Sequence, residues 1–111
     1  MDIKMQEIYI LFCDTELYKV FTNYATAQKC LVDLNENRIK EVSKSNRLSP
    51  EVDLDRIMEI IQGEGGWYSL RQSQVPENEE DDEKIIEQHG EAISGTEYSL
   101  EEIRDAEWIH E

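Results

Sequence analysis

The sequence has few of the residues that cross-link a chain or carry it through a membrane. Its two cysteines, Cys13 and Cys30, are too few and too far apart for a disulfide framework or a zinc knuckle. We interpret both as buried, reduced thiols, with Cys13 inert in its apolar strand. The longest apolar run, residues 8–13, is far shorter than the roughly 20 residues of a spanning helix. The N-terminus also lacks a secretory signal, so we expect a cytoplasmic protein that does not contact membranes.

Basic residues are scarce, and their scarcity is local. The chain holds 26 acids and 11 bases, a formal net charge of −15. Residues 1–76 carry 12 acids and 9 bases, whereas residues 77–111 carry 14 acids and only Lys84 and Arg104. The acidity therefore belongs to the last third of the chain. It argues against direct binding to nucleic acid and favours either a partner with a basic surface or a simple gain in solubility.

Catalytic and ligand-binding motifs are also lacking. Neither His89 nor His110 stands near a serine or cysteine in a recognisable nucleophile motif. The glycines of residues 63–66 follow a predicted helix and precede a strand, the reverse of a phosphate-binding loop, so they indicate a helix stop and a flexible turn. The carboxylates of residues 81–83 lack the alternating spacing and glycine of a calcium loop. We predict no enzyme activity, no metal site and no cofactor.

The first two thirds of the chain predict a small α+β core. Residues 7–13 read as a central strand with two apolar faces, and residues 17–21 as the return strand of a hairpin. A helical period begins at Tyr24, with Thr22 or Asn23 as its N-cap.

The second half of this core supplies another helix and strand. Ser49 and Pro50 predict the start of a helix over residues 50–62 that stops at Gly63. Residues 67–75 predict a third strand, closed by Pro76. The order is β-β-α-α-β, a small antiparallel three-stranded sheet with two helices, assigned to a core domain of residues 1–76.

The last third divides into an acidic linker, residues 77–84, and an acidic, partly helical extension, residues 85–111. Ser99 and Glu102 fit a capping box that opens a short helix reaching Trp108 or Ile109.

The acidic run has two interpretations. It is either a solvated linker, or a surface that imitates nucleic acid. Six acids among residues 77–83 would give about one charge per 1.75 Å if the run were helical, close to the roughly 1.7 Å of duplex DNA. Tyr98, Trp108 and Ile109 either anchor a partner beside this charge or dock back onto the sheet. The candidate partner-binding residues are Glu77, Glu79, Glu80, Asp81, Asp82, Glu83, Glu101, Glu102, Asp105 and Trp108.

The segment Tyr-Lys-Val-Phe-Thr-Asn-Tyr-Ala-Thr-Ala at residues 18–27 resembles a pattern common in small bacteriophage accessory proteins. In those proteins a short hairpin leads into a helix that bears Ala and Leu. The resemblance covers residues 7–34 and implies a phage-type product, many of which bind a host protein; it transfers no site residue. We therefore hypothesise an inhibitor of a host nuclease, restriction or CRISPR effector, polymerase or chromatin-like protein. The alternative is a structural or scaffolding accessory whose acidic tail only confers solubility.

Overall fold

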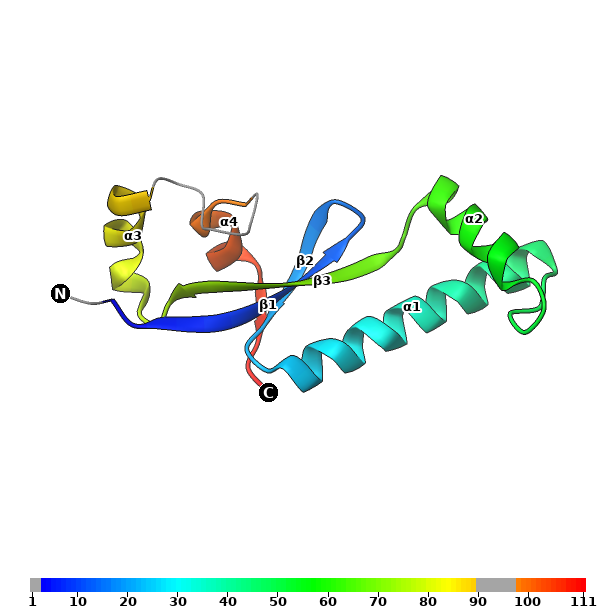
Figure 1. Cartoon of the computed structure of the whole chain (residues 1–111), viewed down its shortest axis with the longest axis horizontal. Helices are drawn as coiled ribbons and strands as arrows, with labels where there is room; N and C mark the ends of the chain where they lie inside the picture. The colour runs from blue at the N-terminus through cyan, green and yellow to red at the C-terminus, as the bar shows by residue number, and fades with distance from the viewer. Residues whose placement is uncertain (1–2, 90–97) are drawn as a thin grey trace.

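A computed structural model describes residues 3–89 and 98–111, and in it two helix pairs lie at opposite ends of a sheet (Figure 1). The elements in chain order are β1 (Met5–Cys13), β2 (Glu16–Phe21), α1 (Tyr24–Asn46), α2 (Leu54–Glu64), β3 (Tyr68–Pro76), the 3-10 turn η1 (Glu79–Asp81), α3 (Asp82–His89), α4 (Leu100–Asp105) and β4 (Glu107–Ile109). The molecule measures 58 × 26 × 18 Å, with a radius of gyration of 17.2 Å. A compact chain of this length would have about 13 Å. The elongation arises because α1 and α2, the helical arm, project beyond the sheet.

The sheet contains one strand more than the sequence predicts. Its order is β3-β1-β2-β4, with β1 antiparallel to both of its neighbours and β4 parallel to β2. The predicted α+β class and the three antiparallel strands are confirmed. The prediction of a purely antiparallel three-stranded sheet is wrong, because the end of the chain adds a fourth, parallel strand.

The central strand β1 is covered on both faces, whereas its apolar pattern predicts cover on at least one. Ile8 and Ile10 are fully buried on one face, where they pack with Leu100 and Ile103 of α4. Leu11 is fully buried on the other face, beneath α1. The C-terminal segment therefore covers one face of β1.

In the helical arm, α1 begins where the sequence predicts, but α2 begins later than predicted. The Asn23 side chain accepts a hydrogen bond from the Thr26 N–H at 3.2 Å and caps α1. The second helix begins at Leu54, not at Pro50. The N–H of Asp53 donates to the Ser49 carbonyl at 2.7 Å, and the Asp53 carboxylate accepts from the Ser49 N–H at 2.9 Å. These two bonds fold the predicted first turn of the helix into a separate tight turn.

The end of α2 lies two residues beyond the predicted stop. Gly63 is helical, and Gly65 ends the helix with a φ of 87° that favours glycine. Its N–H donates to the Ile61 carbonyl at 2.7 Å. The next N–H groups, of Gly66 and Trp67, donate to the carboxylate of Asp14 at 2.9 to 3.2 Å. The glycine turn therefore binds an anion, but the anion is a side chain of the β1–β2 hairpin.

The predicted N-cap at Ser99 is present, but the helix it opens is short. The Ser99 hydroxyl accepts a hydrogen bond from the Glu102 N–H at 3.2 Å, and α4 ends at Asp105. The prediction that this helix reaches Trp108 or Ile109 is wrong. The edge of β2 offers hydrogen bonds to extended backbone, and the Ile109 carbonyl accepts one from the Thr22 N–H at 3.1 Å. Residues 107–109 therefore form β4.

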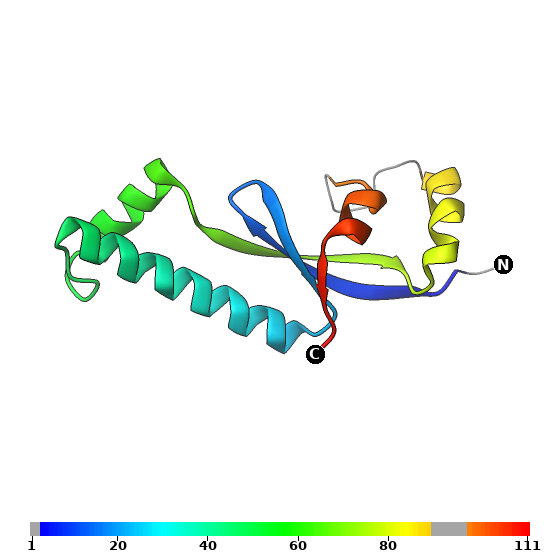
Figure 2. The ribbon, with the colours of Figure 1, turned by 180° about the vertical axis from the view of Figure 1, so that it is seen from behind.

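The acidic run leads directly into secondary structure. Residues 79–81 form η1, and α3 begins at Asp82. Figure 2 shows α3 and α4 rising on the same side of the sheet. None of the helices within residues 3–89 and 98–111 is long and apolar enough to cross a membrane.

Candidate partner-binding surface

Most of the predicted partner-binding acids are exposed. Asp81 and Asp82 are half-buried, and the others lie open to solvent on η1, α3, α4 and the residue that follows β3. We call the exposed set the acidic surface. Its members are Glu77, Glu79, Glu80, Glu83, Glu101, Glu102 and Asp105.

Asp82 has an internal partner, Arg104. The Arg104 guanidinium donates to both Asp82 carboxylate oxygens, at 2.8 and 2.9 Å, and also to the Pro76 carbonyl at 2.8 Å. The two side chains are only 16% and 13% exposed, so solvent screens the pair weakly. The hydrogen bond to Asp82 raises the pKa of Arg104, although its partial burial acts in the opposite direction. This two-pronged salt bridge joins α3, α4 and the end of β3.

Asp81 is the second predicted partner-binding acid that is paired within the protein. Its carboxylate lies 3.3 Å from the ammonium of Lys84, which is half exposed. Lys84 and Arg104 are the only bases among residues 77–111, and each is paired with an acid of the run. Lys19 of β2 lies 3.9 Å from Glu107, an acid that is outside the acidic surface.

The run is not one helix. Residues 79–81 have 3-10 geometry, α-helical geometry begins only at Asp82, and Asn78 is extended. The charge spacing of about 1.75 Å that a continuous helix would give is therefore not the observed arrangement. The described acids are distributed over η1, α3, α4 and the residue after β3, not along a single helical row.

Of the two predicted positions for Trp108, an anchor for a partner or a contact with the sheet, the structure has the contact with the sheet. The ring packs against the buried cluster of Ile8 and Ile103, and its Nε1 donates to the Ile103 carbonyl at 2.8 Å. The Arg104 guanidinium lies over the ring, 5.4 Å from its centroid. Tyr98 also turns inward, where its hydroxyl donates to the Thr15 carbonyl. The fold thus already uses the indole N–H and much of the ring, and a role for Trp108 in binding a partner stays a prediction.

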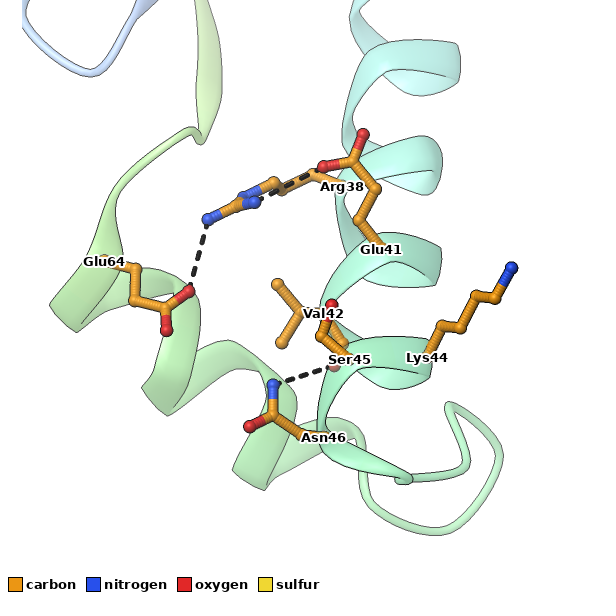
Figure 3. A pocket seen from close by; sticks show the side chains of 7 residues that line it. All are labelled: Arg38, Glu41, Val42, Lys44, Ser45, Asn46 and Glu64. Carbon is orange, nitrogen blue, oxygen red and sulfur yellow. Dashed lines mark hydrogen bonds and ion pairs between the residues drawn. The ribbon is translucent and has the colours of Figure 1, made fainter.

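A polar hollow lies between the two helices of the arm (Figure 3). Arg38 of α1 crosses it, with ion pairs to Glu41 at 3.4 Å and to Glu64 of α2 at 3.5 Å. The same guanidinium donates to the Gly65 carbonyl at 2.9 and 3.1 Å. Lys44 points away from this cluster. Two carboxylates and a carbonyl already satisfy Arg38, so the hollow ties the arm together and presents no open anion site.

Cys13 differs from its prediction. It is half-buried because it is the last residue of β1, where the cover of the sheet ends. It lies beside Tyr68, whose pKa is raised first by burial and then by the neighbouring thiol. Within residues 3–89 and 98–111, no group of three or more His, Cys, Asp or Glu side chains is arranged to hold a metal ion.

The residue that sequence reasoning missed is Arg104. Arg104 could have been noticed because it is one of only two bases in a segment that carries 14 acids, where a base has many acids to pair with. Burial of an arginine requires such a partner. Sequence spacing gave no means of choosing Asp82 among the acids.

Comparison with models of protein families, with curated proteins and with solved structures found no match to this chain.

Proposed function

We propose that this protein acts without catalysis, by stoichiometric binding of its acidic surface to a basic groove of a nucleic-acid-handling protein. One observation carries the proposal: the Asp82–Arg104 salt bridge holds α3 against α4, while the acids around it stay exposed. The acidic surface is thereby attached to a folded scaffold. Both bases of residues 77–111 are occupied by Asp81 and Asp82, so they do not neutralise it.

A fixed patch of charge binds better than a flexible tail of equal charge. An ordered surface does not lose side-chain and backbone entropy again when it docks. Its field also steers a basic partner toward it and speeds association at low salt. Grooves lined with basic residues are the sites where proteins hold nucleic acid. This reasoning selects nucleases, restriction or CRISPR effectors, polymerases and chromatin-like proteins as the target class, and the phage-like hairpin start is compatible with such an inhibitor.

The test uses capture from host-cell lysate on three immobilised proteins. The first is the full chain, and the second carries Glu79→Gln, Glu80→Gln and Glu83→Gln. The third is a matched control in which three exposed acids of the arm region are neutralised, Asp33→Asn, Glu36→Gln and Glu51→Gln. The second and third proteins have the same net charge, and both keep Asp82.

We expect the full chain and the arm control to retain basic nucleic-acid-binding proteins, and duplex DNA or raised salt to release them. The variant of residues 79, 80 and 83 should lose them, mainly through slower association. Capture that is equal on all three proteins and insensitive to DNA would contradict the proposal.

A second candidate, a scaffolding accessory, is favoured by apolar side chains on the helical arm. Val32 is 42% exposed, Val52 in the turn before α2 is 83% exposed and Leu54 is 46% exposed. In that case the arm contacts the partner, and the capture of that partner should not depend on salt. The capture should be lost in a variant with Val32→Ser, Val52→Thr and Leu54→Gln.

A further inference from the structure

The strand β3 has one paired side and one open side. Glu77 donates its N–H to the Lys4 carbonyl, and the Trp67 carbonyl accepts from Asp14, so both residues face β1. Backbone groups alternate in direction along an antiparallel strand. The N–H and C=O groups of Tyr68, Leu70, Gln72, Gln74 and Pro76 therefore point away from the sheet.

Side chains close this edge at its two ends. At one end, the Asn35 amide donates to the Tyr68 carbonyl at 3.0 Å and accepts from the Tyr68 N–H at 2.9 Å. At the other end, Pro76 has no N–H, and its carbonyl accepts from Arg104. The outward groups of Leu70, Gln72 and Gln74 have no hydrogen-bond partner among residues 3–89 and 98–111. Figure 2 shows this strand running between the helical arm and α3.

We propose that the open edge of β3 pairs with β3 of a second copy of the chain, antiparallel and centred on Gln72. In that register Gln72 lies opposite Gln72 of the second copy, Leu70 lies opposite Gln74, and Gln74 lies opposite Leu70. Each of these three pairs exchanges two backbone hydrogen bonds, so the dimer gains about six. The capped ends, Tyr68 and Pro76, also fall opposite one another, so the pairing ends at the same place in both copies.

The side chains of the strand suit this symmetric partner. Residues 65–76 contain no acid, in a chain that carries 26. The one charged side chain of β3, Arg71, would lie opposite Ser73 of the second copy, so no like charges meet directly. Gln72 and Gln74 are exposed and Leu70 is half-buried, which leaves the centre of the edge accessible. Sheet edges that proteins protect against pairing usually carry several charges, whereas β3 carries only Arg71.

Repulsion between the acidic surfaces does not oppose the antiparallel arrangement. From Tyr68 to Pro76 the strand advances eight residues, so the two copies of Pro76 would lie about 27 Å apart at roughly 3.4 Å per residue. That separation exceeds three Debye lengths at physiological ionic strength, about 8 Å each. Parallel pairing would instead place the two acidic runs side by side, which excludes it as the favoured arrangement.

The first test measures the mass of the full chain by light scattering and sedimentation across a range of concentrations. The wild type should form a concentration-dependent dimer. Gln72→Pro removes only an outward N–H, so the bonds to β1 survive, and circular dichroism should report a folded chain. Its dimer dissociation constant should rise by about tenfold or more, because two central hydrogen bonds are lost. The matched control Gln72→Ala keeps the N–H and should dimerise like the wild type.

The second test examines the register itself. Gln72→Lys and Gln72→Glu each place like charges opposite one another at the symmetry axis, so each variant alone should be more monomeric. An equal mixture of the two should restore dimers that contain one copy of each. A wild type that stays monomeric, a dimer that Gln72→Pro leaves intact, or charge variants that fail to form mixed dimers would overturn the proposal.

Discussion

The helical arm and the C-terminal helix pair, α3 and α4, extend the same sheet by different interactions. In the arm, α2 packs on α1 through an apolar cluster of its own, in which Val42, Ile57 and Ile61 are buried. In the C-terminal pair, α4 packs into the core of the sheet, and α3 is tied to α4 by the Asp82–Arg104 salt bridge. The contact between α2 and α1 can thus change with little effect on the sheet, whereas the part of α1 over Leu11 and the C-terminal pair cannot. A charged, polar segment is here the one that completes the main core.

Removal of residues 77–111 should lower the free energy of unfolding more than either of the substitutions that follow. It uncovers Ile8 and Ile10 and loses two fully buried side chains, Leu100 and Ile103. At about 1.5–3 kcal/mol for each of the two, the free energy of unfolding should fall by roughly 3–6 kcal/mol, a large share of a typical 5–15 kcal/mol. The measurement is urea denaturation, in which the predicted core of residues 1–76 should still unfold cooperatively. An unchanged midpoint would show that the C-terminal third is a mere appendage.

Asp82→Asn should have an intermediate effect. It keeps the shape of the side chain and removes one charge from a pair whose side chains are only 16% and 13% exposed. The free energy of unfolding should therefore fall by about 1.5–3 kcal/mol. Asp81→Asn is the matched control, because its partner Lys84 is half exposed and the loss should stay below about 1 kcal/mol. Urea denaturation of both variants measures the difference. Equal losses would mean that α3 does not depend on this salt bridge.

Gly63→Ala should have the smallest effect, and in the stabilising direction. Gly63 is helical, and an added Cβ would meet no atom within 4 Å. Alanine should therefore add about 0.5–1 kcal/mol to the stability of the arm. Gly65→Ala is the contrast, because its φ of 87° and the Asp14 carboxylate oxygen 2.9 Å from the new Cβ make alanine unfavourable there. Thermal unfolding distinguishes the two, and a destabilising Gly63→Ala would contradict the observed length of α2.

Local patterns in the sequence predicted most of the first two thirds of the fold. The apolar run of β1, the cap at Asn23 and the cap at Ser99 each act over a few residues, and all three are present. The errors lie where specific hydrogen bonds, which the apolar pattern does not reveal, decide the structure. A tight turn at Ser49 and Asp53 displaced the start of α2, and the open edge of β2 drew residues 107–109 into a strand.

The candidate site shows the same division. Exposure of the acids on α3 and α4 follows from their charge, and sequence reasoning could predict it. The inward position of Asp82 could not be predicted, because it depends on Arg104, 22 residues away. The position of Trp108 also depends on contacts across the sheet, with Ile8 and Ile103 among them.

The parallel pairing of β2 with β4 sets an order of events during synthesis. It joins Lys19 to Glu107, so β4 cannot pair with β2 until residue 107 has emerged from the ribosome. At about 5–20 residues per second, β1 and β2 wait roughly 4–16 s for α4 to cover Ile8 and Ile10. The acids of residues 77–83 are translated before α4, within that interval. The nascent chain therefore carries the acidic run of residues 77–83 while its apolar face is still bare, and we expect that charge to keep it from aggregating.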